Sequence, residues 1–296
     1  MKLSVLIPTH DYKCFTLVAE LQRQLMVARV QYEVIVADDG SRDQVSVIAN
    51  LRINELPGCR YIKREKNVGR AAIRNFLIGE AKGEWLLFLD SDAAVDSPLF
   101  IWRLLDAIEQ ANDAQVIMGG LHHATRMPRP EVSLRYRYEK AADRHRSAEE
   151  RSSHPYQHVT AFNLCVKGDV ARRLPFDEHC KEYGFEDALY GVVLKRYGIK
   201  ILHIDNPLLH RGLENNEVFL AKTEAAMRTL AALGRRMMIY TGVGRAVLTA
   251  KKYHIKWLVA LLFRIMRPVM RHNLLGITPN LNIFSFYKLG YLCTKY

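Results

Sequence analysis

Short apolar runs alternate with stretches of helical periodicity through the first third of the chain. The apolar runs, which predict strands, lie at residues 3–8, 33–37, 60–63 and 85–89. Apolar positions at helical spacing predict helices at 17–26, 44–51 and 69–82. This alternation is typical of a parallel β-sheet with helices on both faces.

The rest of the chain follows a different pattern. We expect strands at 115–118, 159–166 and 200–204, and helices at 134–151 and 187–197. Residues 213–296 are helical and basic in character, without a strand rhythm. The expected fold class is therefore α/β: a Rossmann-like, mostly parallel central sheet flanked by helices at 1–212, and a helical, basic C-terminal extension at 213–296.

Composition supports one large globular domain with an appendage. The chain has 296 residues, of which 49% are hydrophobic and 25% charged, so a sizeable core is available. Its five cysteines are widely spaced and include no CxxC pair, so we expect no disulfide framework or zinc site, and a cytoplasmic location. The first apolar run is too short for a signal peptide and ends at Pro8, and no apolar run of about 18 residues predicts a membrane span.

The net charge of +12 narrows the choice of partners. Nucleic acid, an anionic membrane surface or phosphorylated substrates could account for it, as could a generally basic surface. Nucleic-acid-binding proteins interleave basic residues with aromatics or form a known module, and neither occurs here, so we expect no nucleic-acid partner.

Polar side chains follow three of the expected strands. They lie at residues 9–11, 38–41 and 90–92, directly after the first, second and fourth apolar runs. Ligands of open α/β sheets bind outside the carboxyl ends of the strands. Carboxylates and hydroxyls at three strand ends therefore suit a nucleotide and a metal ion.

The triplet at 90–92 suits a divalent cation. Asp90 and Asp92 are one residue apart at the end of a buried strand, where they can share Mg²⁺ or Mn²⁺. These ions take oxygen ligands and commonly bridge to substrate phosphates, and the positive charge would neutralise a leaving diphosphate. The alternative is a solvated turn, which is how most such triplets occur.

Two further segments suit a nucleotide. At 38–41 a strand ends in two acids and a tight turn, where Asp39 could bind a base or ribose or could cap the next helix. At 67–75 a helix opens with Arg70 and Arg74 near its N-terminal amides, an arrangement that suits phosphate. The alternative there is an amphipathic helix with solvated arginines.

The motifs at 5–9, 38–41, 67–75 and 90–92 together resemble, in order and spacing, those of the family 2 glycosyltransferases of the GT-A fold. The resemblance covers residues 1 to about 212. It implies an inverting transfer of sugar from a nucleotide sugar, expected to be a UDP-sugar, to an acceptor hydroxyl with Mn²⁺ or Mg²⁺. It also implies a nucleotide-sugar-binding half at 1–92 and an acceptor-binding half at 93–212.

The resemblance implies roles for single residues as well. On the donor side, Thr9 and Asp39 would contact the base and ribose, and Asp11 would assist them. Arg70 and Arg74 would face the diphosphate or sugar. Asp90 would contact the ribose or sugar. Asp92 would be the main metal ligand and His210 a further one. Asp187 would be the general base and Glu186 would orient the acceptor or the helix start, although simple capping of a helix start is the alternative for this pair. Asn163 would line the acceptor site.

Residues 251–272 have the pattern of a basic amphipathic helix. On a helical projection the cations occupy about a third of the circle and apolar side chains the rest. Pro268 is expected to kink or end the helix. Such a helix could pack on the catalytic domain, but we expect it to lie in an anionic membrane interface with Trp257 near the headgroups. The enzyme would then sit peripherally on the inner face of the cell membrane, beside a saccharide or lipid-linked saccharide acceptor.

Two other functions compete with glycosyl transfer. A nucleotidyltransferase acting on a sugar phosphate would show a glycine-rich loop after its first strand, and residues 8–10 contain no glycine. A basic nucleic-acid-binding protein is the weaker alternative, for the reason given above. Assembly of a bacterial surface polysaccharide is expected by analogy only.

Overall fold

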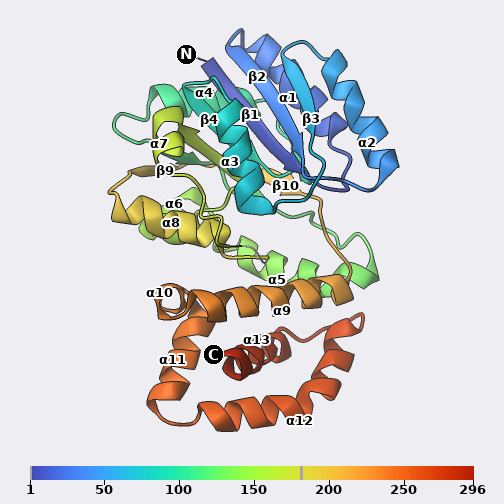
Figure 1. Cartoon of the computed structure of the whole chain (residues 1–296), viewed down its shortest axis with the longest axis vertical. Helices are drawn as coiled ribbons and strands as arrows, with labels where there is room; N and C mark the ends of the chain where they lie inside the picture. The colour runs from blue at the N-terminus through green and yellow to red at the C-terminus, as the bar shows by residue number, and fades with distance from the viewer. Residues whose placement is uncertain (1, 181–182) are drawn as a thin grey trace. The chain divides into compact units, whose positions relative to one another are not determined.

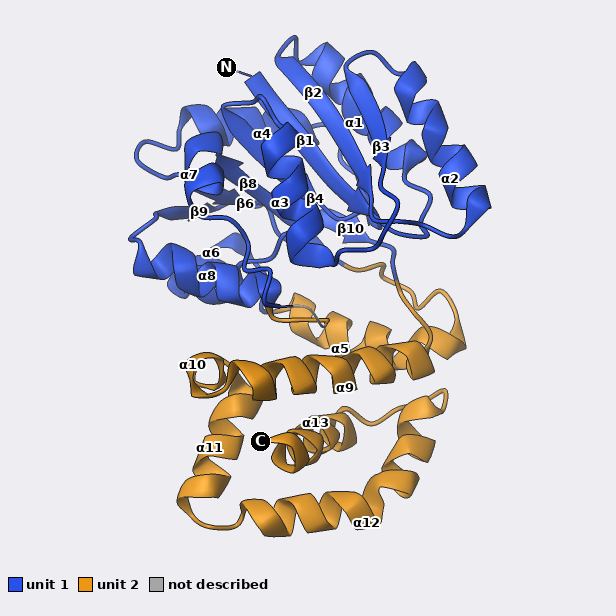
Figure 2. Ribbon diagram, in the orientation of Figure 1, with its two compact units in different colours: residues 1–122, 145–181, 186–212 blue, residues 123–144, 182–185, 213–296 orange. Residues whose placement is uncertain are grey.

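The computed structural model describes residues 2–180 and 183–296, and the chain separates into two compact units (Figure 2). The first unit contains residues 1–122, 145–181 and 186–212. The second contains 123–144, 182–185 and 213–296, so the C-terminal segment shares its unit with a stretch from the middle of the sequence.

Seven strands form the central sheet of the first unit in the order β3-β2-β1-β4-β8-β6-β9 (Figure 1). Their bounds are β1 Lys2–Thr9, β2 Gln31–Asp38, β3 Cys59–Lys63, β4 Trp85–Leu89, β6 Val116–Met118, β8 Asn163–Lys167 and β9 Ile201–His203. β8 is antiparallel to its neighbours β4 and β6, whereas the other neighbouring pairs are parallel. The expected mostly parallel α/β sheet is confirmed.

Helices cover both faces of this sheet because both faces are apolar. Leu87 of β4 belongs to one buried cluster together with Leu21, whereas its neighbour Leu86 belongs to a second cluster together with Leu77. Successive side chains of a strand point to opposite faces, so continuous apolar runs such as 85–89 need cover on both sides. The helices of this unit are α1 Phe15–Val27, α2 Gln44–Leu51, α3 Arg70–Glu80, α4 Phe100–Glu109, α6 Ala148–Ser153, α7 Gly168–Arg173 and α8 Glu186–Arg196.

A second, three-stranded sheet lies in the same unit. Its order is β5-β10-β7, and its strands are β5 Ala93–Ala94, β10 Leu208–His210 and β7 Leu121–His122. The first strand follows directly on the 90–92 triplet, and the second ends at His210. This small sheet therefore joins two segments that are far apart in the sequence.

The second unit is helical, as expected for the C-terminal segment. Its helices are α5 Ser133–Asp143, α9 Asn216–Leu233, α10 Arg235–Met238, α11 Gly242–Lys252, α12 Lys256–Leu275 and α13 Leu281–Lys295. The buried amide of Asn216 donates to the carbonyl of Gly276 at 2.9 Å and accepts the N–H of Leu134 at 2.8 Å, so one side chain ties three segments together. Among the residues that the structure describes, none of the helices is long and apolar enough to cross a membrane.

Two helix predictions need correction. The helix expected at 134–151 is two helices, because α5 ends at Asp143 and the Ser147 hydroxyl caps α6 by accepting the N–H of Glu150. The helix expected at 251–272 is also divided, because Lys251 and Lys252 are the last residues of α11 and α12 starts at Lys256. Pro268 does not end α12, which continues to Leu275. Burial of Met270 and Leu274 beyond the proline outweighs the hydrogen bond that proline removes.

A buried arginine joins the ends of β6 and β9. Arg151 donates to the carbonyl oxygens of Met118 at 3.0 Å and Ile204 at 2.7 Å, and to Nδ1 of His203 at 2.9 Å. Burial lowers the pKa of His203 to about 4, and the charge of Arg151 acts in the same direction, so the imidazole accepts as a neutral ring. His203 therefore has a structural role.

We predict that Arg151→Met destabilises the protein by roughly 2–4 kcal/mol, because the carbonyl groups of Met118 and Ile204 and the ring of His203 each lose a charged donor. The measurement is urea unfolding followed by circular dichroism. Arg23→Met is the matched control, since Arg23 is an exposed arginine paired with Glu20 and its loss is expected to change little. Equal unfolding midpoints for the two variants would contradict the structural role of Arg151.

Candidate active site

Three polar segments meet at one edge of the central sheet. β1 lies between β2 and β4 and is parallel to both, so all three strands end on the same side (Figure 1). Thr9 is in register with Asp38, and the N–H of Asp39 donates to the Thr9 carbonyl at 2.8 Å. The strand order thus brings residue 9 beside 38–39 and 90–92.

The Asp39 carboxylate bridges β2 to the start of α3. It is buried and accepts the N–H groups of Val68 at 2.8 Å and Gly69 at 3.0 Å. Gly69 has φ +92°, a left-handed conformation that favours glycine. The helix after β2 is capped instead by Asp43. Asp39 therefore does not cap α2, and it holds the loop before α3 against the sheet edge.

Asp11 and Thr9 are held by local hydrogen bonds. One Asp11 oxygen accepts the N–H groups of Arg42 at 2.7 Å and Asp43 at 2.8 Å. The hydrogen bond from Asp43 is the main reason why the pKa of Asp11 lies below its usual value. The buried Thr9 hydroxyl donates to the carbonyl of Tyr12 at 3.1 Å. These bonds fix the loop after β1 beside the turn after β2.

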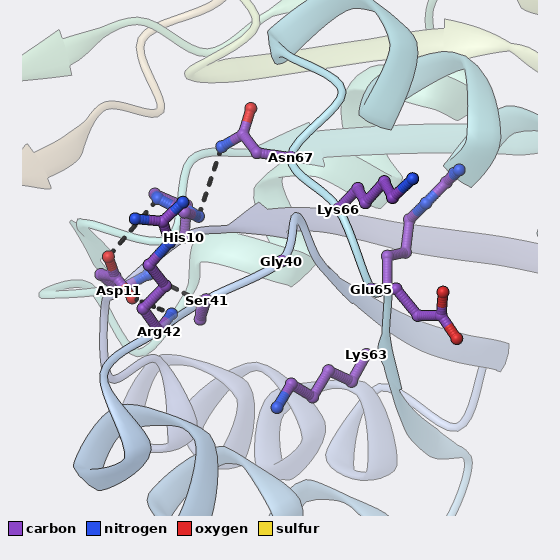
Figure 3. Close-up of a pocket in the computed structure, with 10 residues that line it drawn as sticks. His10, Asp11, Gly40, Ser41, Arg42, Lys63, Glu65, Lys66 and Asn67 are labelled. Carbon is purple, nitrogen blue, oxygen red and sulfur yellow. Dashed lines mark hydrogen bonds and ion pairs between the residues drawn. The ribbon is translucent and has the colours of Figure 1, made fainter.

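A cavity of about 990 Å³ opens between these loops (Figure 3). His10, Asp11 and Arg42 lie on one side of it in the view, and Lys63 and Lys66 on the other, with the Gly40 turn between them. A polar cavity of this size, with basic side chains around it, is large enough for a nucleoside and attracts phosphate.

Arg74 lies at the centre of a charge cluster. The residue is 1% exposed, and its guanidinium donates to Asp90 at 2.9 Å and to Glu186 at 3.3 Å, with Asp187 at 3.6 Å. Arg70 donates to the same Glu186 oxygen at 3.4 Å and has a 47% exposed side chain. Three carboxylates face two guanidiniums, which leaves an excess of one negative charge.

Because of this excess negative charge, the two acids at the start of α8, Glu186 and Asp187, have different pKa values. Burial acts to raise the pKa of Glu186, but the guanidiniums of Arg74 and Arg70 outweigh it and hold that pKa below its usual value. Burial and the neighbouring Glu186 charge raise the pKa of Asp187 to about 6. One Asp187 oxygen accepts the hydroxyl of Thr160 at 3.2 Å, and the other is buried without a hydrogen bond. Such a carboxyl group is suited to accept a proton near neutral pH.

Asp92 and His210 lie together although 118 positions separate them in the sequence. His210 pairs with Ala93 across β10 and β5, which places its Nε2 atom 3.2 Å from Oδ2 of Asp92. The Arg211 N–H also donates to the Asp92 carbonyl at 3.0 Å. Gly212 makes room for the carboxylate, because a Cβ atom there would lie 1.8 Å from Oδ2.

This pair fits a divalent cation. Neighbouring ligands of an octahedral ion with bonds of ~2.1 Å lie roughly 3 Å apart, which is close to the separation observed here. A carboxylate oxygen with an imidazole nitrogen is a donor set that suits Mn²⁺, whereas Mg²⁺ prefers oxygen alone.

The structure places Asn163 and Arg74 in surroundings that differ from those expected from the sequence. The buried amide of Asn163 donates to the carbonyls of Gly120 and Asn206, each at 3.0 Å, so its NH₂ group is used within the fold. Arg74 is enclosed by carboxylates, whereas Arg70 is half exposed. These positions favour Arg70 over Arg74 as a contact for an incoming anion.

Sequence reasoning missed several residues of this region. Thr160 is one, because nothing in its sequence context marks it as a partner of Asp187. Tyr12 is another: burial and then the charge of Asp92 raise its pKa, so its hydroxyl lies near the metal ligand candidate. Lys63 and Lys66 could have been found, since a basic stretch directly follows the third expected strand at the edge where ligands bind.

A Rossmann-like sheet with acidic motifs at these strand ends is the GT-A arrangement of glycosyltransferases. The family model for glycosyl transferase family 2 matches residues 4–163, which is more than half of the chain. The chain belongs to this family.

Curated relatives match over a limited stretch. An uncharacterized glycosyltransferase of Rickettsia felis is 33% identical over 96 residues, which cover 31% of this chain and 15% of that protein. The poly(ribitol-phosphate) β-N-acetylglucosaminyltransferase TarS of Staphylococcus aureus is 34% identical over 96 residues, 31% of this chain and 16% of TarS. The matched part is thus less than a fifth of either relative.

Solved structures match over nearly the whole chain. TarS residues 1–349 in complex with UDP-GlcNAc has a TM-score of 0.55 at 17% identity, covering 100% of this chain and 90% of that chain. A mannosyltransferase of Pyrobaculum calidifontis in complex with GDP-Man and Mn²⁺ has a TM-score of 0.53 at 12% identity, covering 99% of this chain and 85% of that one. At these identities the likeness establishes the fold alone.

We predict that Gly212→Ala weakens Mn²⁺ binding by about 10- to 100-fold, because the new methyl group displaces the Asp92 carboxylate. Isothermal titration of Mn²⁺ in the presence of nucleoside diphosphate measures this. Gly79→Ala is the control: a Cβ atom there meets nothing within 4 Å, so its titration should match that of the wild type. Unchanged Mn²⁺ affinity in Gly212→Ala would show that Asp92 is not a ligand in this geometry.

Proposed function

We propose that this protein is an inverting, metal-dependent glycosyltransferase that transfers sugar from a UDP-sugar to an acceptor hydroxyl. The observation that carries the proposal is the charge cluster around Arg74. It supplies one carboxyl group with a raised pKa at the sheet edge where Asp39 and the Asp92–His210 pair also lie. The UDP-GlcNAc complex of the TarS fragment, which shares this fold, supports the choice of donor.

Residues 1–92 would bind the donor. Thr9 and Asp39 are proposed to contact the base and ribose, with Asp11 fixing the turn beside them. Asp90 would hold the ribose or sugar. Arg70 would contact the diphosphate because it is half exposed, whereas the buried Arg74 would position Asp90, Glu186 and Asp187.

Asp92 and His210 would hold Mn²⁺ or Mg²⁺. When bound, such an ion supplies positive charge that stabilises the diphosphate leaving group. The Mn²⁺ complex of the mannosyltransferase with the same fold supports a metal, and the nitrogen donor favours Mn²⁺.

Asp187 is the proposed general base. It would take the proton of the acceptor hydroxyl while the hydroxyl oxygen forms a bond to the anomeric carbon and the bond to the diphosphate breaks on the opposite face. The nucleoside diphosphate leaves with the electron pair, and the anomeric configuration inverts. Glu186, held by two guanidiniums, would stay ionised and orient the acceptor or the start of α8.

The acceptor and location are proposals as well. Residues 93–212 would bind the acceptor, a saccharide that is free or carried on a lipid, although the buried Asn163 amide contributes to the fold rather than to a contact. The name of TarS gives poly(ribitol-phosphate) as the molecule it modifies, which supports a polymer as the product here, and assembly of a bacterial surface polysaccharide is proposed by analogy. The five cysteines are free thiols, in keeping with a cytoplasmic location.

A donor panel tests the proposal. UDP- and GDP-sugars are incubated with and without Mn²⁺ in the absence of acceptor, and released nucleoside diphosphate is measured. We expect Mn²⁺-dependent release of UDP that Asp92→Ala abolishes and the control Asp96→Ala retains, since Asp96 is an exposed acid paired with His122. Pyrophosphate release from a nucleoside triphosphate and a sugar phosphate would instead indicate a nucleotidyltransferase.

The pH dependence of transfer tests the base. Only ionised Asp187 can take a proton, and its pKa is raised to about 6, so kcat/KM should fall as the pH drops below about 6 and level off above it. Asp187→Asn should retain donor binding, lose about 10²- to 10⁴-fold in transfer rate, and lose the acidic limb of the profile.

Asp177→Asn makes the same chemical change at an exposed carboxylate paired with His179 and should behave as the wild type. If Asp187→Asn transfers sugar at the original rate, another group is the base.

A further inference from the structure

α12 has two apolar faces, and the second unit uses only one of them. Phe263, Met270 and Leu274 are buried, and the Phe263 ring lies edge-on to Tyr287 of α13, with ring centroids 5.1 Å apart. Gly290 of α13 admits this ring, because a Cβ atom there would lie 2.5 Å from Phe263. This face accounts for the packing of α12 within the unit.

The other face is apolar and exposed to solvent. We call it the α12 apolar face, and it consists of Trp257, Leu258, Leu261, Leu262, Ile265, Met266 and Val269. Trp257 is 66% exposed, Ile265 67% and Val269 71%. Residues 257, 261, 265 and 269 follow at intervals of four, so they line one side of the helix. A surface helix ordinarily presents polar side chains to water, so a continuous apolar face indicates an interaction surface.

Positive charge is concentrated in the same part of the chain. Residues 213–296 contain 13 Lys and Arg against three Glu, a net charge of +10 out of +12 for the whole chain. The last acidic residue of the sequence is Glu224. Whatever contacts this segment therefore meets a strongly cationic surface.

The contacts show which cations can face a partner. Arg267 and Arg271 lie 3.1 Å and 3.5 Å from the Glu224 carboxylate, so they are used inside the unit. Lys251, Lys252 and Arg264 are exposed. Of the cations that the helical projection placed on one side of this segment, Arg267 and Arg271 are therefore excluded as partner contacts. The exposed Lys251, Lys252 and Arg264 remain, and they lie beside the α12 apolar face.

We propose that the α12 apolar face docks into the interface of an anionic lipid bilayer, with the helix axis in the membrane plane. The seven apolar side chains would enter the boundary between headgroups and acyl chains, and the exposed cations would meet anionic headgroups. Trp257 combines an apolar ring with an N–H donor, which suits the headgroup level.

Charge favours a lipid surface over the other occupants. A second copy of this chain would bring two segments of +10 against each other, which opposes association, whereas anionic lipid neutralises them. A nucleic acid would satisfy the charge but would leave seven apolar side chains in water. The docking surface is separate from the residues proposed for the reaction and does not depend on them.

The experiment is flotation of the full chain with vesicles of phosphatidylcholine alone, or with about a third phosphatidylglycerol. Trp257→Glu/Ile265→Glu replaces two of the seven apolar side chains of the face with carboxylates. Trp102→Glu/Ile48→Glu is the matched control, because those residues are also exposed, at 59% and 65%, lie in the first unit, and undergo the same change of charge. Because all four substituted residues are exposed, both variants are expected to keep the fold, and thermal unfolding checks this.

We expect the wild type and the control to float with anionic vesicles and to bind neutral vesicles more weakly. The α12 variant should bind the anionic vesicles at least about tenfold more weakly, because two large apolar side chains no longer insert. Donor hydrolysis in solution should be the same for all three proteins, so failure of docking is distinguishable from failure of the proposed reaction.

A second measurement does not rely on a variant of the face. Among the three tryptophans, Trp85 is buried and Trp102 lies in α4, so brominated acyl chains should quench mainly Trp257 fluorescence when vesicles bind. Two results would overturn the proposal. One is an equal loss of flotation in the two variants. The other is a dimer in the wild type that is lost in the α12 variant while flotation stays unchanged.

Discussion

The guanidinium of Arg74 is enclosed by the carboxylates of Asp90, Glu186 and Asp187, and the other features of the reaction site depend on this set of charges. A buried arginine is stable only when it is paired, so the end of β4, the start of α3 and the start of α8 are held together. Because Arg70 pairs with the same Glu186 oxygen, the two guanidiniums hold the pKa of Glu186 down, whereas burial and the Glu186 charge raise the pKa of Asp187. One acid therefore stays ionised while its neighbour acquires a pKa suited to proton transfer.

Strand order supplies the rest of the site. β1 lies between two strands that follow it in sequence, and this arrangement joins the ends of segments that are 30 and 80 residues apart. The small β5-β10 pairing does the same for Asp92 and His210 with only a few backbone hydrogen bonds. In both cases main-chain pairing sets the position of the side chains. In the second case Gly212, which has no Cβ atom, also leaves room for the Asp92 carboxylate.

The two units of the chain differ in how much of their apolar surface they bury. In the first, helices cover both faces of the sheet, and the apolar runs of the strands are fully enclosed. In the second, α12 packs one apolar face on α13 and leaves the other in water beside exposed cations. Exposure of that apolar surface to water is unfavourable. An anionic lipid partner that covers it therefore explains the exposed face better than a helix that stays in water.

The sequence by itself determined the fold class and the edge of the sheet where the chemistry lies. Apolar runs of five to eight residues, each followed by acids or hydroxyls, are local patterns, so Thr9, Asp39, Asp90 and Asp92 could be picked out without coordinates. It could not determine that Arg74 is buried, that the Asn163 amide is used by backbone carbonyls, or that Arg267 and Arg271 pair with Glu224. Burial, pKa and pairing depend on neighbours contributed by distant segments, and only the tertiary structure decides which segments those are.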